Sequence, residues 1–175
     1  MNKSFTMFIM ILSVLALLVS QGYAATPKET VQNGVDKVVA TLSDPKFKEK
    51  TKDEKIEMVS EIINEIFDFN ELSRRTLGRG WKKMSSEQQT EFVDLFRKLL
   101  QGVYADRLLA YSDQKVIFDK EIMLKKGRAE VQSYLQTADG KKIPLFYRLT
   151  DKSGSWRGYD VIIEGVSMVK NYRTQ

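Results

Sequence analysis

An α+β fold, with N-terminal helices packed on a twisted antiparallel sheet of about four to five strands, is predicted by a change of hydrophobic period along the chain. Before Lys115, apolar residues recur every three or four positions, as they do on one face of a helix. From Lys115 onward they alternate with polar residues, as in strands that bury one face. Helices followed by an antiparallel meander indicate a curved sheet with helices covering one of its faces.

Residues 1–24 have the pattern of a cleavable secretory signal peptide. Lys3 precedes an almost wholly apolar run, residues 5–19, and small residues follow up to Ala24. The alternative is a membrane anchor, but about fifteen apolar residues fall short of the roughly 20 that a spanning helix needs. Cleavage after Ala24 would leave residues 25–175, which we expect to form a single exported domain.

The composition narrows both the compartment and the chemistry. The chain has no cysteine, and therefore no disulfide framework and no cysteine to carry a lipid anchor, which favours a freely diffusing protein of the periplasm. It also has no histidine, so the commonest general base and several metal ligands are missing. The net charge of +5 is spread along the chain and suits anionic membrane surfaces, acidic partners or an ordinary solvated surface. Export argues against a nucleic-acid partner.

Two amphipathic helices are predicted first. Residues 28–42 carry valines and a leucine at helical spacing, and Asp44-Pro45 ends that helix. Residues 46–55 are expected to be a solvent-facing connection of mixed charge. A Thr51-x-x-Glu54 capping box then introduces a second helix with a strong apolar stripe.

A short helix and a long one follow. Asp68 or Asn70 is a suitable N-cap for the short helix, which stops at Gly78. A Ser85-x-x-Gln88 capping box opens the longest helix, residues 89–110. Its apolar arc is wider than one flat sheet would cover, so the helices and the sheet together present more apolar surface than a core of this size needs.

Short strands are predicted at residues 116–118, 122–125, 128–137, 143–149 and 156–163, with a hairpin turn at Asp139-Gly140. Pro144 favours an edge position or a bulge for its strand. In the last strand, simple alternation puts Tyr159, Val161 and Ile163 on one face, and Gly158, Asp160 and Ile162 on the other. A corner at Gly165 then leads into a second extended segment that includes Val166 and Met168.

Three carboxylates lie in strongly apolar contexts: Asp68, Asp160 and Glu164. A carboxylate pair could act as general acid and base, because apolar burial raises a carboxyl pKa. The structural alternative is that Asp68 caps a helix and Asp160 pairs with an arginine such as Arg148. The chain has no nucleophile elbow, phosphate loop or metal-ligand cluster, so the structural alternative is favoured and no enzyme activity is expected.

A basic cluster lies between the short helix and the long one, and consists of Arg74, Arg75, Arg79, Lys82 and Lys83. Arginine forks match phosphate oxygens, so one interpretation is contact with a lipid head group or an acidic partner. The other interpretation is the solvated side of a short helix. The residues alone do not choose between the two.

Three stretches resemble the MlaC family of periplasmic phospholipid-binding proteins, also called the toluene-tolerance auxiliary family. They are FDFNELSRRTLGRGW at residues 67–81, SSEQQTEF at residues 85–92 with its continuation to Tyr104, and the run from residue 143 through the Tyr147-Arg148 pair to EGVSMVKNYR at residues 164–173. The resemblance spans most of the chain after the signal peptide. It departs from the family at the C-terminus, because the family continues past the NYR motif with a phenylalanine and a terminal helix.

The resemblance implies a carrier with no cofactor that holds phospholipid as cargo, its acyl chains in a deep apolar pocket between helices and sheet. The implied partners are an inner-membrane ABC transporter complex with its periplasmic lipid-binding subunit, and an outer-membrane lipoprotein-porin complex. A quinone or a hopanoid is the alternative cargo. Carried over from the family, the lipid-binding residues are Phe69, Leu72, Leu77, Phe96, Leu99, Leu100, Val103, Tyr104, Tyr147, Val161, Ile163, Val166 and Met168.

Overall fold

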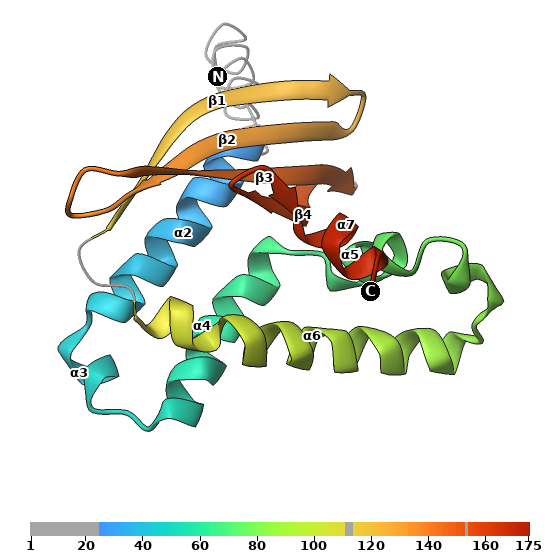
Figure 1. The fold of residues 1–175 in the computed structure, drawn as a ribbon, viewed down its shortest axis with the longest axis horizontal. Helices are drawn as coiled ribbons and strands as arrows, with labels where there is room; N and C mark the ends of the chain where they lie inside the picture. Colours follow the sequence, from blue (N-terminus) through green and yellow to red (C-terminus); the bar gives the residue numbers. More distant parts are fainter. Residues whose placement is uncertain (1–24, 111–113, 153) are drawn as a thin grey trace, which may run out of the picture.

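A computed structural model describes residues 25–110, 114–152 and 154–175 (Figure 1). The predicted signal peptide lies outside the described residues. The helices are α2 (Pro27–Ser43), α3 (Pro45–Lys48), α4 (Lys52–Ile66), α5 (Phe69–Leu77), the 3-10 helix η1 (Gly80–Lys83), α6 (Ser86–Leu109) and α7 (Met168–Arg173). The strands are β1 (Lys115–Lys125), β2 (Arg128–Gln136), β3 (Lys142–Lys152), β4 (Ser155–Ile163) and β5 (Val166–Ser167). The α+β class is confirmed.

The strands form one antiparallel sheet in the order β1-β2-β3-β4-β5. Helix α2 crosses under one face of this sheet and contacts β1, β2 and β4. Helix α6 runs along the long axis of the molecule on the side away from the sheet, and α4 lies between it and α2 (Figure 1). Helices α5 and α7 lie between the sheet and α6, whereas α4 crosses α6 and extends beyond it (Figure 1).

Local capping determines where the main helices begin. The capping boxes predicted at Thr51 and Ser85 are both present, and a third at Thr26 opens α2. Asp68 caps α5 by accepting a hydrogen bond from the Glu71 backbone N at 2.9 Å, and α5 ends at Gly78 with φ +56°. These predicted helix boundaries are confirmed.

The expectation for residues 46–55 was wrong. Asp44 accepts a hydrogen bond from Lys46 N at 2.8 Å and caps the start of the short helix α3. Asp44-Pro45 therefore ends α2 and also begins α3. As a result Phe47 is buried, with only 5% exposure, against Leu42 and Val59. A single aromatic residue among lysines has no periodicity, and the sequence pattern could not place it in a core.

The sheet differs from expectation at two positions. The two short strands predicted before residue 126 are one strand, β1, with an irregularity in register between Phe118 and Lys120. Pro144 lies in the inner strand β3 and not at an edge. The Pro144 carbonyl accepts a hydrogen bond from Glu164 N at 3.0 Å. The nitrogen of a strand residue points to the same side as its carbonyl, so the Pro144 nitrogen faces Glu164. Glu164 follows the last β3–β4 pair, Leu145 with Ile163, so the missing N–H of Pro144 removes no hydrogen bond from the paired part of the strands.

The predicted alternation along β4 was also wrong. Asp160 pairs with Arg148 and Gly158 pairs with Leu149, so Tyr159 is the extra residue of a β-bulge. Gly158 therefore shares a face with Val161. The bulge is set by how two strands pair and cannot be read from one strand alone.

The expected second extended segment after Gly165 is only the two-residue strand β5. Gly165 has φ +83°, as predicted for a tight corner. Beyond it the chain turns into α7, because Ser167 caps the helix by accepting from Lys170 N at 3.1 Å. Asp160 adds a second cap by accepting from Val169 N at 3.0 Å and from the Ser167 hydroxyl at 2.7 Å.

Strand β4 also holds the junction between α4 and α5. The Arg157 guanidinium donates to the carbonyl oxygens of Asn64 at 2.6 Å and Phe67 at 2.9 Å, at the C-terminal end of α4. The Gly158 carbonyl accepts from Asp68 N at 2.8 Å. The Phe67 ring lies directly over Gly158, where no side chain is in the way.

Helix α5 is held against the bulge by a charge cluster. The Glu71 carboxylate accepts from Arg74 at 2.7 and 2.8 Å and from Arg75 at 2.7 Å, and the Arg75 guanidinium lies 3.8 Å from the centre of the Tyr159 ring. Burial by itself would raise the pKa of Glu71, but the hydrogen bonds and charges of Arg74 and Arg75 outweigh it and hold that pKa below its ordinary value.

Many of the described buried apolar residues fall into three clusters. The sheet cluster consists of Val31, Val131, Tyr147, Leu149 and Val161. The α6 cluster consists of Leu72, Phe96, Leu100 and Val169. The α3 cluster consists of Leu42, Phe47 and Val59.

Gly158→Ala is expected to lower the free energy of unfolding by about 1–3 kcal/mol, because overpacking forces the neighbours to move. The added Cβ would lie 2.7 Å from two carbons of the Phe67 ring. Gly102→Ala is the matched control: it adds the same methyl group to α6 with no atom within 4 Å. It should raise stability by up to about 1 kcal/mol, since alanine favours the helix. Urea denaturation measures both, and equal effects of the two changes would contradict the predicted crowding.

Glu71→Gln is expected to cost about 1–2 kcal/mol of stability at neutral pH, allowing for the partial exposure of Arg74. A carboxyl with a lowered folded-state pKa stabilises the fold above its unfolded-state pKa, roughly 4.3, and loses that contribution as pH falls through the folded-state pKa. The difference from wild type should therefore shrink below roughly pH 4. Urea denaturation across pH checks this, with the exposed Glu57→Gln as a control expected within about 0.5 kcal/mol of wild type. A loss that stayed constant with pH would count against the ionic role.

Candidate functional site

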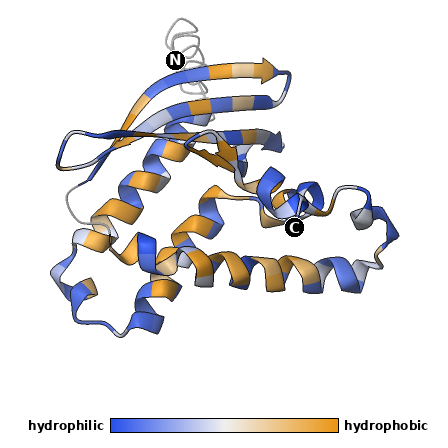
Figure 2. Cartoon of the chain, in the orientation of Figure 1, coloured by the Kyte–Doolittle hydropathy of each residue, from blue (hydrophilic) through white to orange (hydrophobic). Residues whose placement is uncertain are grey.

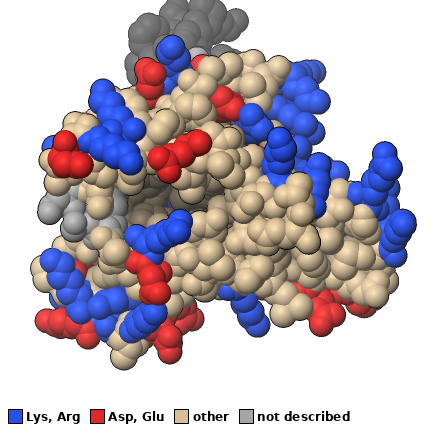
Figure 3. Space-filling view, in the orientation of Figure 1, with Lys and Arg blue, Asp and Glu red and all other residues tan. Residues whose placement is uncertain are grey.

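The face shown in Figure 3 is hollowed between the sheet and the helices on the opposite side. Hydrophobic segments lie along α2, α4 and α6 around this region (Figure 2). The sheet cluster lies on the strand side and the α6 cluster on the helix side. Phe67 and Met168 pack against both clusters and connect them. The two apolar clusters are thus connected through Phe67 and Met168.

The structure brings most of the predicted lipid-binding residues into these two clusters. Tyr147, Val161 and Ile163 belong to or pack on the sheet cluster, and Met168 packs on both. The members or neighbours of the α6 cluster are Phe69, Leu72, Phe96, Leu100 and Tyr104. Leu77 is half-buried outside both clusters. Three residues lie on the surface instead: Leu99 and Val103 are 49% exposed and Val166 is 59% exposed.

Tyr147 is the polar group of the sheet cluster. It is 7% exposed, and its hydroxyl has no hydrogen-bond partner among the described residues. Burial raises the pKa of this phenol above its ordinary value, so it stays protonated at any physiological pH. A neutral O–H inside an apolar interior can donate one hydrogen bond to a bound polar group.

The predicted basic cluster divides into two parts. Arg74 and Arg75 are held by Glu71, and the Arg75 guanidinium is packed over the Tyr159 ring, so both serve the fold. Arg79, Lys82 and Lys83 are exposed, and their side chains form no ion pair within the described part of the chain. These three remain free to contact a charged ligand or partner.

The predicted carboxylates have structural partners. Asp68 caps α5 and forms an ion pair with Lys152. Asp160 is 3% exposed and caps α7, with the Arg148 guanidinium 4.0 Å away. Glu164 is exposed in the turn after β4. Within residues 25–110, 114–152 and 154–175, no group of acidic residues could hold a metal ion.

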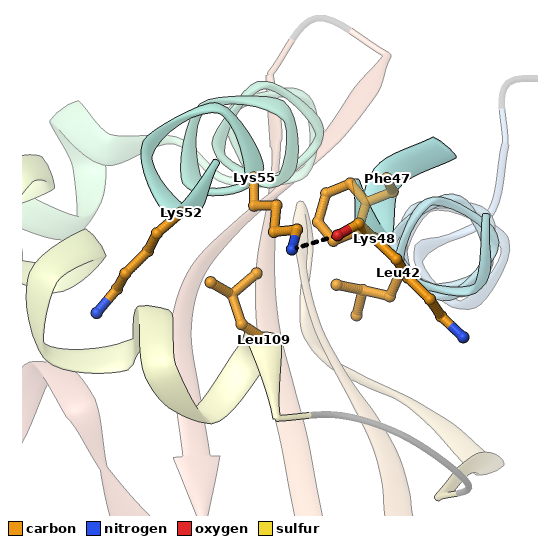
Figure 4. Close-up of a pocket in the computed structure, with 6 residues that line it drawn as sticks. All are labelled: Leu42, Phe47, Lys48, Lys52, Lys55 and Leu109. Carbon is orange, nitrogen blue, oxygen red and sulfur yellow. Dashed lines mark hydrogen bonds between the residues drawn. The ribbon is translucent and has the colours of Figure 1, made fainter. Parts of the chain in front are cut away.

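One cavity was missed by the sequence reasoning. It has a volume of about 260 Å³ and is lined by Leu42, Phe47, Lys48, Lys52, Lys55 and Leu109, at the corner where α2, α3, α4 and the end of α6 meet (Figure 4). The repeated lysines around Phe47 were visible in the sequence, but only the burial of Phe47 gives them an apolar floor. A second hollow of about 360 Å³ lies between α4 and Gln101 of α6. Both are lined by helix residues, and the deep pocket between helices and sheet stays a prediction.

In the part of the chain that the structure describes, no helix is both long and apolar enough to cross a membrane.

Comparison with known proteins identifies the relatives of this chain. Residues 32–175 match the family model described as MlaC protein. The intermembrane phospholipid transport system binding protein MlaC of Haemophilus influenzae is 25% identical over 178 residues, covering 98% of this chain and 82% of that protein. Toluene tolerance protein ttg2D of Pseudomonas putida is 25% identical over 154 residues, covering 87% of this chain and 72% of that protein.

A solved structure also matches. The phospholipid-binding protein from Ralstonia solanacearum, determined in complex with a phospholipid, superposes with a TM-score of 0.78 and 27% identity, covering 86% of this chain and 85% of that one. The family model, the relatives and the shared fold agree with the resemblance that the sequence motifs indicated. The chain belongs to the MlaC family.

Proposed function

We propose that this protein is a periplasmic phospholipid carrier that shuttles lipid between outer-membrane and inner-membrane complexes and so maintains outer-membrane lipid asymmetry. The observation that carries the proposal is the match, over 86% of this chain, to a structure that contains a phospholipid. The relatives are named as phospholipid transport and toluene tolerance proteins. The proposed partners are the inner-membrane ABC transporter complex with its periplasmic lipid-binding subunit and the outer-membrane lipoprotein-porin complex.

A carrier is needed because phospholipid does not cross water at a useful rate. Two acyl chains of about sixteen carbons hold roughly 30 methylenes, and at about 0.8 kcal/mol each their transfer from bilayer to water costs on the order of 25 kcal/mol. An apolar interior replaces the bilayer at little net cost. Such a protein needs no catalytic group, and the engagement of Asp68 and Asp160 in capping supports a role in binding.

The sheet cluster and the α6 cluster are the proposed walls of the acyl-chain site. Among the described residues, Phe67 and Met168 are the side chains that pack against both clusters. Acyl chains that enter between them would separate the two surfaces without breaking the attachments of β4 to α4, α5 and α7. The Tyr147 hydroxyl would be the polar group that reaches an ester or glycerol oxygen of the lipid.

Two exposed features supply a docking surface for the proposed partners. Leu95, Leu99 and Val103 form an apolar stripe along α6, with 57%, 49% and 49% exposure. Arg79, Lys82 and Lys83 lie just before the start of the same helix. An exposed apolar stripe on the helix that these cations precede suits a partner with an apolar patch and an acidic region.

Native mass spectrometry of protein purified from cells tests the function. We expect bound phospholipid, and uptake of phospholipid from vesicles after delipidation. Extraction of the bound material separates phospholipid from a quinone or a hopanoid. Protein that carries no lipid and takes none from vesicles would refute the proposal.

Met168→Trp is expected to lower lipid loading roughly two- to tenfold, because the larger side chain fills the space where the two clusters meet. The change keeps the residue apolar, so the fold should be retained. Met123→Trp is the matched control, since Met123 is 53% exposed on β1. Lipid per chain by native mass spectrometry and the melting temperature are measured together. Normal loading in a folded Met168→Trp protein would exclude this region as the acyl-chain site.

A further inference from the structure

The cavity at the α3 corner combines an apolar floor with a rim of lysines. Leu42 and Phe47 are 9% and 5% exposed and form the floor with Leu109. Figure 4 shows the Lys55 side chain pointing between Leu42 and Leu109, while Lys48 and Lys52 extend outward from the rim. Such a combination is suited to an amphiphile with an anionic group.

The lysines have unused hydrogen-bonding capacity. The Lys55 ammonium donates to the Lys48 carbonyl at 3.0 Å and lies 5.9 Å from the centre of the Phe47 ring, which leaves two of its three donors. The Lys48 ammonium has no hydrogen bond or ion pair with a described residue, and its flexible stem can swing inward. Among the described residues, Lys52 alone of these three lysines has an acidic partner, Asp106 at 2.7 Å, and both of those side chains are exposed.

The volume limits what can bind. At roughly 30 Å³ for each water-sized group, a cavity of about 260 Å³ holds eight or nine such groups. That is enough for a phosphate group and a few attached carbons. It is too small for two acyl chains, so the rest of a larger ligand would have to leave along the protein surface or through the interior.

Helix α2 carries a stripe of apolar residues that runs from this cavity to the sheet cluster. Val31 belongs to the sheet cluster and Val35 packs on it, while Val38 packs on the α3 cluster and Leu42 belongs to it. These positions lie three or four residues apart, so they form one stripe on α2. The stripe joins the proposed acyl-chain region to the lysine-rimmed cavity, which favours a lipid over a free phosphate ion as the source of the anionic group.

We propose that the α3-corner cavity binds the phosphate group of a phospholipid head, with Lys48 and Lys55 as donors and the acyl chains leading away along the α2 stripe. This inference rests on the proposed function and names the head-group end of its ligand. This head-group position differs from the basic cluster expected from the sequence. In that cluster, Arg74 and Arg75 are already held by Glu71 within α5.

Titrations with three probes test the site: dodecyl phosphate below its micellar concentration, inorganic phosphate, and the uncharged dodecyl maltoside. Dodecyl phosphate should bind at least about tenfold more tightly than either of the others, and Lys48→Gln/Lys55→Gln should weaken it about tenfold. Lys48→Arg/Lys55→Arg should restore binding. Lys126→Gln/Lys141→Gln removes the same charge from exposed turns of the sheet and should stay within about twofold of wild type.

The possible outcomes distinguish a failure of the proposed phosphate site from a failure of the proposed carrier function. Unchanged dodecyl phosphate binding in a folded Lys48→Gln/Lys55→Gln protein would overturn the site, even if the protein purified from cells carries phospholipid. Equal affinity for inorganic phosphate would overturn the lipid source, and equal affinity for the maltoside would overturn the role of charge. Loss of dodecyl phosphate binding in this variant, together with cell-purified protein that carries no lipid, would support the site and refute the carrier function.

Discussion

The fold depends on a run of consecutive residues in β4, from Arg157 to Asp160, that attaches the sheet to three different helices. Arg157 satisfies the last carbonyls of α4, and the Gly158 carbonyl binds the first residue before α5. Tyr159 lies under Arg75 of α5, and Asp160 caps α7. These are polar contacts with defined geometry, which fix the helices in position without filling the space between the layers.

This arrangement suits the proposed lipid site between the helices and the sheet, because the helices are held in place by polar contacts. A single continuous core would close the interior, because packed side chains leave few voids. Here the attachments run along one strand, and the apolar residues form three clusters that meet only at a few shared side chains. The stability that a continuous core would contribute is partly replaced by caps and charge-assisted hydrogen bonds, such as those of Glu71 and Asp160.

The buried charges of this protein serve the architecture. Glu71, Glu130 and Asp160 each have an arginine or a helix N-terminus as partner. From the sequence, Arg74 and Arg75 were as good candidates for a ligand site as for a structural role. The sequence does not show whether an arginine pairs with an acidic residue of its own helix, as both do with Glu71, or with another molecule. The lysines around Phe47 show the converse, because in the sequence they resemble a solvated stretch, whereas the buried Phe47 ring places them around a cavity.

By itself, the sequence determined the features that depend on neighbouring residues: the capping boxes at Thr51 and Ser85, the stop at Gly78, the turn at Gly140, the α+β class and the family. Hydrogen bonds that span three or four residues follow from local order, and so they can be read from it. Only the tertiary structure decided the bulge at Tyr159, the burial of Phe47, the second cap that Asp160 gives to α7 and the contact of Arg75 with Tyr159. Each of these depends on contacts between residues distant in the chain, which local patterns do not encode.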